Sequence, residues 1–311
     1  MEKLTEKTIG ALVAGSEGIL RREHKILYGG RVLKGNLTSA VKEIRDILEK
    51  GDKEYFVSFS LKAGRVRWLW ISSRIQSGFF GDIIYLKIFH ISPGELGKGT
   101  LRRVIAAARK YHKAGRAKVY VALYLPDNGA VSELGKNGFK DVLYGLSART
   151  GESLKTMSGL TRELPAGYRI KPIDFKRSME QYLNLCVRTM KTDRTSATYN
   201  APAARLKKTY RSNIAKGVRE KAFGLYFKDK LVGEITLGKA HGDPSIGLVA
   251  GIGILPEHRG KGLSKFLYRK GLEWFREKNR RMYIGQSSST GVLAQAGKMK
   301  RKRVYVLLKS S

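Results

Sequence analysis

The chain has 311 residues, of which 42% are hydrophobic, and a formal net charge of +35 at pH 7. This length suits about two domains with packed cores, and no run approaches the ~20 apolar residues that a membrane-spanning helix needs. The single cysteine, Cys186, excludes an intramolecular disulfide, and the N-terminus lacks the pattern of a signal peptide, so we expect a cytoplasmic protein.

The positive charge is unevenly distributed along the chain. Residues 1–155 contain 28 Lys and Arg against 15 Asp and Glu, whereas residues 156–311 contain 33 against 11. Such a surplus attracts polyanions, so an anionic partner is one interpretation: nucleic acid, a ribonucleoprotein or an anionic envelope surface. The alternative is a proteome in which many proteins are basic.

In chain order, the first half predicts a helix, a hairpin and a strand–helix–strand unit. Helices are expected at Ser39 to Lys50, Leu101 to Lys113 and Asn128 to Lys136. Strands are expected at Lys53 to Lys62, Arg65 to Ser73, Asp82 to Ser92 and Val119 to Tyr124, the first two joined by a turn at Ala63 and Gly64.

The second half opens with a predicted linker, because Thr150 to Thr161 is polar and contains Gly and Ser. The following predictions are a strand at Gly167 to Pro172, a helix at Asp174 to Thr189, a hairpin of Ala222 to Phe227 with Leu231 to Leu237, and strands at Ile246 to Leu255 and Arg281 to Gln286.

The most informative segment follows the apolar run Ile246 to Leu255. A basic, glycine-rich turn, Arg259 to Gly262, opens directly into an amphipathic helix. The first amides of a helix have no intrahelical partner and the helix dipole is positive there, so this arrangement predicts an anion site. The alternative is an ordinary basic connection. A Walker phosphate loop is excluded by the glycine spacing.

The detail of this turn resembles a known family. Arg259-x-x-Gly262-x-Ser264 is similar to the R/Q-x-x-G-x-G/A signature of the GNAT N-acetyltransferase superfamily, with Ser264 in place of Gly or Ala. The resemblance implies that the loop amides bind the pyrophosphate of acetyl-CoA and that the preceding strand binds the pantetheine arm. The implied cofactor-binding residues are Ile252, Gly253, Ile254, Arg259, Gly260, Lys261, Gly262, Leu263, Ser264 and Ser289, with no metal.

The pattern occurs twice at a constant offset of 163, which places Pro93 to Leu101 over Pro256 to Ser264. An ungapped repeat predicts two tandem domains of one α/β fold with a mixed (α+β) sheet: residues 1–155 and 165–311. In the first copy Leu96 replaces the arginine, and Leu101 occupies the small-residue position, where its side chain is expected to fill the space a phosphate needs. We therefore expect a degenerate first loop.

Catalytic residues are harder to assign. The strand Ile246 to Leu255 has no carboxylate, and Glu234, on the neighbouring strand, is the best candidate for a general base. Its alternative is an outward-facing carboxylate paired with lysines. His241 and Asp243 fall in a turn expected at the wrong end of the sheet. Residues 188–221, basic with interleaved tyrosines, suit an anionic acceptor or else form a solvated helix face.

These observations predict an acyltransferase that moves an acetyl group from acetyl-CoA to an amine. Two alternatives stay open: a non-catalytic nucleic-acid- or ribosome-associated protein on a GNAT scaffold, and an aminoacyl-tRNA-dependent transferase. The intact loop at Arg259 to Gly262 favours CoA, because neither alternative needs a pyrophosphate site.

Overall fold

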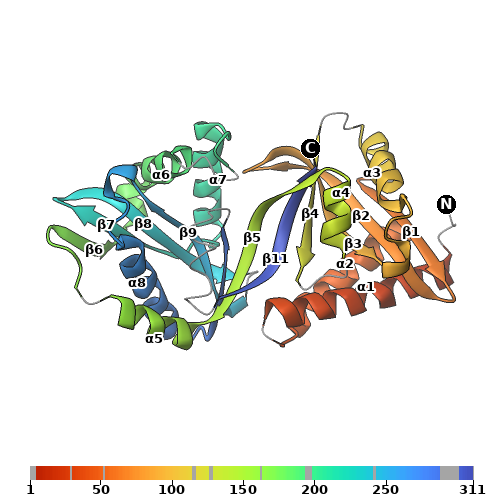
Figure 1. Ribbon diagram of the computed structural model, residues 1–311, viewed down its shortest axis with the longest axis horizontal. Helices are drawn as coiled ribbons and strands as arrows, with labels where there is room; N and C mark the ends of the chain where they lie inside the picture. Colours follow the sequence, from red (N-terminus) through yellow and green to blue (C-terminus); the bar gives the residue numbers. More distant parts are fainter. Residues whose placement is uncertain are drawn as a thin grey trace. The chain divides into compact units, whose positions relative to one another are not determined.

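A computed structural model of the chain describes residues 5–28, 30–51, 53–113, 117–125, 129–161, 163–192, 198–240, 243–287 and 301–310. Helices alternate with the strands of a mixed sheet, as expected for an α/β protein (Figure 1). The chain forms two units: Met1–Val142 with Val304–Ser311, and Leu143–Arg303. Among the described residues, no helix is both long enough and apolar enough to cross a membrane.

The first unit has a five-stranded sheet in the order β1-β2-β3-β4-β11, with β3 and β4 parallel. Its elements are α1 (Glu6–Leu27), α2 (Lys34–Lys50), β1 (Tyr55–Lys62), β2 (Arg65–Ser77), β3 (Gly81–Ile91), η1 (Pro93–Glu95), α3 (Thr100–Tyr111), β4 (Lys118–Tyr124), α4 (Ala130–Lys136) and β11 (Lys302–Ser310). Leu12 of α1 and Ile44 of α2 pack on Leu69 and Ile71 of β2 and form a core.

The second unit has the strand order β5-β10-β9-β8-β7-β6, with β9 and β10 parallel. Its elements are β5 (Phe139–Arg149), α5 (Thr150–Leu160), β6 (Tyr168–Pro172), α6 (Phe175–Lys191), α7 (Ala203–Ala215), β7 (Lys221–Phe227), β8 (Lys230–Ala240), β9 (Asp243–Ile254), η2 (Pro256–His258), α8 (Leu263–Glu277) and β10 (Met282–Ser287). Figure 1 shows α6 and α7 on one face of this sheet and α8 with α5 on the other.

Two strands pair with strands from the other half of the sequence. The last strand, β11, pairs antiparallel with β4 of the first unit, Tyr305 opposite Tyr124. The last strand of the first half, β5, pairs antiparallel with β10 of the second unit, Leu146 opposite Gly285. The sequence halves 1–155 and 165–311 and the two units are therefore different divisions of the chain. That each half is a domain stays a prediction.

The internal repeat is visible in backbone detail. A β-bulge adds Lys87 to β3 and Ala250 to β9, at the predicted offset of 163. The glycine turns match as well: Gly97 and Gly99 have φ of 77° and 69°, and Gly260 and Gly262 have φ of 79° and 70°. The parallel strands that follow are shifted by one residue, because Ile83 pairs with Lys118 but Ile246 with Met282.

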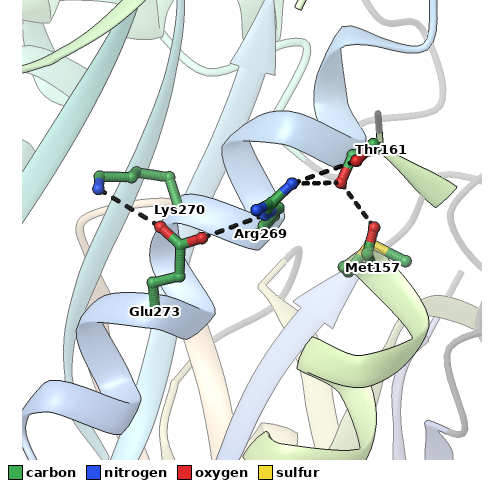
Figure 2. A network of polar contacts seen from close by, with 5 residues as sticks. All are labelled: Met157, Thr161, Arg269, Lys270 and Glu273. Atoms are coloured by element: carbon green, nitrogen blue, oxygen red, sulfur yellow. Dashed lines mark hydrogen bonds and ion pairs between the residues drawn. The ribbon is translucent and has the colours of Figure 1, made fainter. Parts of the chain in front are cut away.

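The predicted linker at Thr150 to Thr161 is wrong, because the segment forms helix α5. Ser153, Leu154 and Met157 are buried at the spacing of one helix face. Arg269 of α8 donates to the carbonyl and hydroxyl oxygens of Thr161 at 3.1 and 3.3 Å, and Glu273 accepts from Arg269 at 3.1 Å (Figure 2). Gly151 and Gly159 on the exposed side hid this pattern. Most other predicted elements differ from the structure only at their ends, whereas α1, α7, β5 and β11 were not predicted as elements.

Candidate functional site

The glycine turn lies at the end of β9 and leads into α8. Gly262 is the N-cap residue, and its positive φ, like that of Gly260, is a conformation that L side chains rarely adopt. A Cβ atom at either glycine would meet no other atom within 4 Å, so the turn is open. Within the described part of the chain, no group accepts a hydrogen bond from the amides of residues 260–264. These amides form an anion-binding arrangement.

The cations of the turn are held by neighbouring groups. Arg259 donates from Nε to the Ile254 carbonyl at 2.8 Å and from Nη2 to Thr192 Oγ1 at 3.2 Å. Lys261 Nζ donates to the Tyr168 hydroxyl at 3.3 Å, and this hydroxyl lies 2.8 Å from His258 Nδ1. Both cations are therefore fixed around the amides and contribute positive charge to the turn.

Beside the turn, β9 and β10 separate. They pair in parallel only from Ile246 with Met282 to Val249 with Gly285. From the bulge at Ala250 to Ile254, β9 pairs with β8 but has no strand on its other edge among the described residues. In the described part of the chain, the predicted pantetheine-binding residues Ile252, Gly253 and Ile254 thus lie on a strand edge without a neighbour.

A buried polar cluster lies on the face of the sheet that α6 and α7 cover. Glu234, only 3% exposed, accepts from Thr236 Oγ1 at 2.6 Å through Oε2. Thr236 Oγ1 lies 2.8 Å from the Tyr182 hydroxyl, which accepts from Arg219 Nη1 at 2.8 Å. Arg219 Nη2 also donates to the carbonyl of the bulge residue Ala250 at 3.1 Å. The cluster therefore connects Glu234 to the bulge, and the outward-facing alternative for Glu234 is wrong.

The environment of Glu234 changes its acidity. Burial raises the pKa of the Glu234 carboxyl, while the Thr236 hydrogen bond and the Arg219 charge oppose that increase. Oε1 of Glu234 lies 3.5 Å from the position that a Cβ atom would have at Gly251, and no donor in the described residues reaches this oxygen. A carboxylate with one unoccupied oxygen and a raised pKa can accept a proton.

The other predicted site residues are placed as follows. The Leu263 side chain is buried beneath the turn and can contribute only its amide, whereas Ser264 is half-buried at the start of α8. Asp243 accepts from the Ser245 hydroxyl and amide at the opposite end of β9 from the turn, as expected. Ser289 and His241 lie outside the described residues.

The first-copy turn differs from the expectation. Leu101 is 3% exposed and lines a small cavity together with Trp70 and Phe89, so its side chain lies in the core and does not cover the turn amides. The predicted obstruction by Leu101 is therefore wrong. Glu95, at the end of η1 just before this turn, pairs with Arg67 at 2.9 Å and with Lys98 at 3.5 Å.

Sequence reasoning missed Arg219, Tyr182 and Thr236. Only Thr236 has a readable signal, since it follows Glu234 by two residues on the same strand face. Tyr182 on α6 and Arg219 before β7 come to the cluster through tertiary packing.

Comparisons with known proteins identify a family match and a shared fold. Residues 187–292 match the acetyltransferase (GNAT) family. A tandem GNAT protein from the clavulanic acid biosynthesis pathway is 16% identical, with a TM-score of 0.51 and 87% of each chain covered. The GCN5-related N-acetyltransferase from Sphaerobacter thermophilus is 12% identical, with a TM-score of 0.57 over 87% of this chain and 85% of that one.

A GCN5-related N-acetyltransferase from Kribbella flavida is 14% identical, with a TM-score of 0.50 over 88% of this chain and 94% of that one. At these identities the structures show a shared fold. No curated protein matches the sequence significantly.

Proposed function

We propose that this chain, whose residues 187–292 match the acetyltransferase (GNAT) family and whose fold is shared with tandem GNAT proteins, transfers an acetyl group from acetyl-CoA to an amine. The observation that carries the proposal is the set of unpaired amides at residues 260–264, beside the open edge of β9. Acetyl-CoA supplies the activated acyl group, and the chain supplies the anion site and a base.

The residues present fit the donor. The amides of Gly260 to Ser264 take the pyrophosphate, and the charges of Arg259 and Lys261 add to the positive end of α8. The open edge from Ile252 to Ile254 offers backbone groups to the amide-containing pantetheine arm. In the first copy Leu96 stands where the second copy has Arg259, so that turn lacks one of the two cations, and one CoA per chain is expected.

Glu234 is the base in this proposal. An amine is protonated at neutral pH and must lose a proton before its nitrogen can attack the thioester of acetyl-CoA. The C–N bond then forms as the C–S bond breaks, and the CoA thiolate leaves and takes up a proton. Oε1 of Glu234 faces the space beside Gly251, next to the bulge at which β9 and β10 separate. Burial raises the pKa of Glu234, which strengthens it as a proton acceptor.

Calorimetry of CoA binding tests the proposal, and the repeat provides a matched control. Gly262→Leu places a side chain at φ 70° in the second turn, and Gly99→Leu places the same side chain at φ 69° in the first. We expect wild type and Gly99→Leu to bind one CoA per chain and Gly262→Leu to bind none. Unimpaired binding by Gly262→Leu, in a protein that remains folded by circular dichroism, would show that the loop assignment is wrong.

A further inference from the structure

The polar cluster around Glu234 is not demanded by the fold, because the first unit builds the same positions from apolar residues. His90 and Gly253 are related by the repeat offset of 163, and they pair with Leu69 and Glu234, respectively. In the same way Ile88 and Gly251, also 163 apart, pair with Ile71 and Thr236. Leu69 and Ile71 are fully buried in the hydrophobic core of the first unit. The first unit also forms its bulge, at Lys87, with these apolar residues.

The hydrogen bonds of the cluster run in one direction. A guanidinium has only donors, so the Tyr182 oxygen accepts from Arg219 and its own hydrogen is free for Thr236. Thr236 in turn donates to Oε2 of Glu234. Arg219, Tyr182, Thr236 and Glu234 are each at most 4% exposed, so this chain of bonds lies away from water, where such bonds are strong.

We propose that Arg219 is a positioning residue for acyl transfer: it holds the carbonyl of the bulge residue Ala250 and, through Tyr182 and Thr236, occupies Oε2 of Glu234. Oε1 is then the oxygen that meets the amine beside Gly251. This inference rests on the proposed function, because it assigns a role within the same site. Arg219 stacks on the Tyr210 ring, 3.9 Å from its centroid, which fixes the guanidinium plane.

The charges around Glu234 agree with this role. The titratable groups around Glu234 come from three places: Arg219 before β7, Tyr182 and Cys186 of α6, and Tyr210 of α7. Burial raises the pKa of the Cys186 thiol and of both tyrosine hydroxyls well above neutral, so these groups stay uncharged. Arg219 is therefore the charge that favours the ionised form of Glu234 and offsets its burial.

A matched pair of substitutions at Thr236 tests the proposal. Thr236→Val keeps the shape and removes the hydroxyl, whereas Thr236→Ser keeps the hydroxyl. We expect Thr236→Val to lower kcat by about tenfold or more, since small losses of alignment are costly in catalysis. Transfer is measured as thiol release from acetyl-CoA with a panel of primary amines. The affinity for CoA, measured by calorimetry, should not change, and Thr236→Ser should restore kcat.

A second readout does not depend on turnover. The pKa of Glu234, followed by carboxyl carbon-13 NMR, should rise in Thr236→Val and in Tyr182→Phe, and return in Thr236→Ser, because the hydrogen bond from Thr236 lowers it. Equal pKa values in the Val and Ser variants would overturn the proposal. So would equal kcat values, or losses of kcat that follow thermal stability alone.

The two proposals fail in different ways. A wild-type protein that binds no CoA refutes the proposed function, while the NMR titration still reports whether the chain of bonds controls Glu234. Arg219→Gln completes the test where it folds. Adding Thr236→Val to Arg219→Gln should cause no further loss, because the chain of bonds to Glu234 is already broken at Arg219. Additive losses would contradict the proposal. Tyr182→Phe gives the same comparison if the Arg219 variant does not fold.

Discussion

Two glycines of β9, Gly251 and Gly253, face the same side of the sheet but have different neighbours. A Cβ atom at Gly253 would lie 2.7 Å from Thr189 Oγ1 and 3.0 Å from Thr189 Cβ and Cγ2, closer than real contacts allow. A Cβ atom at Gly251 would meet Glu234 Oε1 at 3.5 Å and Arg219 Nη1 at 3.7 Å, which are ordinary contacts. Alanine at the two positions should therefore have opposite consequences.

Gly253→Ala should destabilise the protein by about 1–3 kcal/mol, the usual cost of overpacking, because α6 must move away from β9. Gly251→Ala should leave stability unchanged or raise it by about 0.4–1 kcal/mol, through the smaller entropy of the unfolded chain. Gly251→Ala should nevertheless lower acyl transfer strongly, because the new methyl group occupies the space that Oε1 of Glu234 faces.

Urea denaturation gives the free energies of unfolding, and thiol release from acetyl-CoA gives the activity. Thr189→Ala removes Oγ1 and Cγ2, two of the three atoms that a Cβ atom at residue 253 would contact. Combined with Gly253→Ala, it should therefore recover part of the lost stability. The reasoning is refuted if both alanine variants lose equal stability, or if Gly251→Ala retains full activity.

Three further predictions concern acidity, the strand exchange and charge. The pKa of Glu234 is raised in the folded protein, so this residue contributes its full stability below its usual pKa of 4.5 and progressively less as the pH rises through the raised value. The unfolding free energy of Glu234→Gln, relative to wild type, should therefore increase over this pH range. The increase should be about 1.4 kcal/mol for each unit that separates the folded pKa from the unfolded pKa. A fragment of residues 1–155 should show no CoA affinity by calorimetry, because it lacks the turn at Gly260 and Gly262, and poor stability by circular dichroism, because it lacks β11 and leaves the edge of β4 unpaired; a stable fragment that binds CoA contradicts this. If a polyanion binds α7, reversing the charge of the four cations of α7 should flatten the salt dependence of duplex DNA binding, whose slope is about −0.9 per phosphate contacted. This effect should be larger than that of reversing the control set Lys176, Lys230, Arg276 and Lys278, and equal effects would mean diffuse attraction. Two of the α7 cations, Lys207 and Arg211, pair with Glu180. The reversed residues are Arg205, Lys207, Lys208 and Arg211.

Local features of this chain were readable from its sequence, and features that depend on distant segments were not. The hairpin of β7 and β8 was predicted because the polar residues Lys228 and Asp229 lie between two apolar runs. In the structure both residues have the positive φ of a tight turn. The turn at Gly260 and Gly262 was predicted for a similar reason, since glycine spacing and backbone conformation are directly linked.

The residues that surround Glu234 come from separate elements. Tyr182 and Arg219 are 37 positions apart, and their hydrogen bond exists only because α6 packs on the sheet beside the start of β7. The strand order escaped prediction because an apolar strand pattern says which face is buried but not which neighbour it pairs with. Helix α5 was also hard to predict because two of its four buried residues, Thr150 and Ser153, are small and polar.

The position of β11 affects how the protein can fold during synthesis. Ser310 Oγ accepts from the amide of Val119, 191 positions earlier, and β11 supplies the strand beside β4. The sheet of the first unit therefore cannot be completed until β11 has left the ribosome. Pairings of such long range make folding slow and leave strand edges exposed in the meantime. Pulse-chase proteolysis of nascent chains should find the first unit protected only after β11 has emerged from the ribosome.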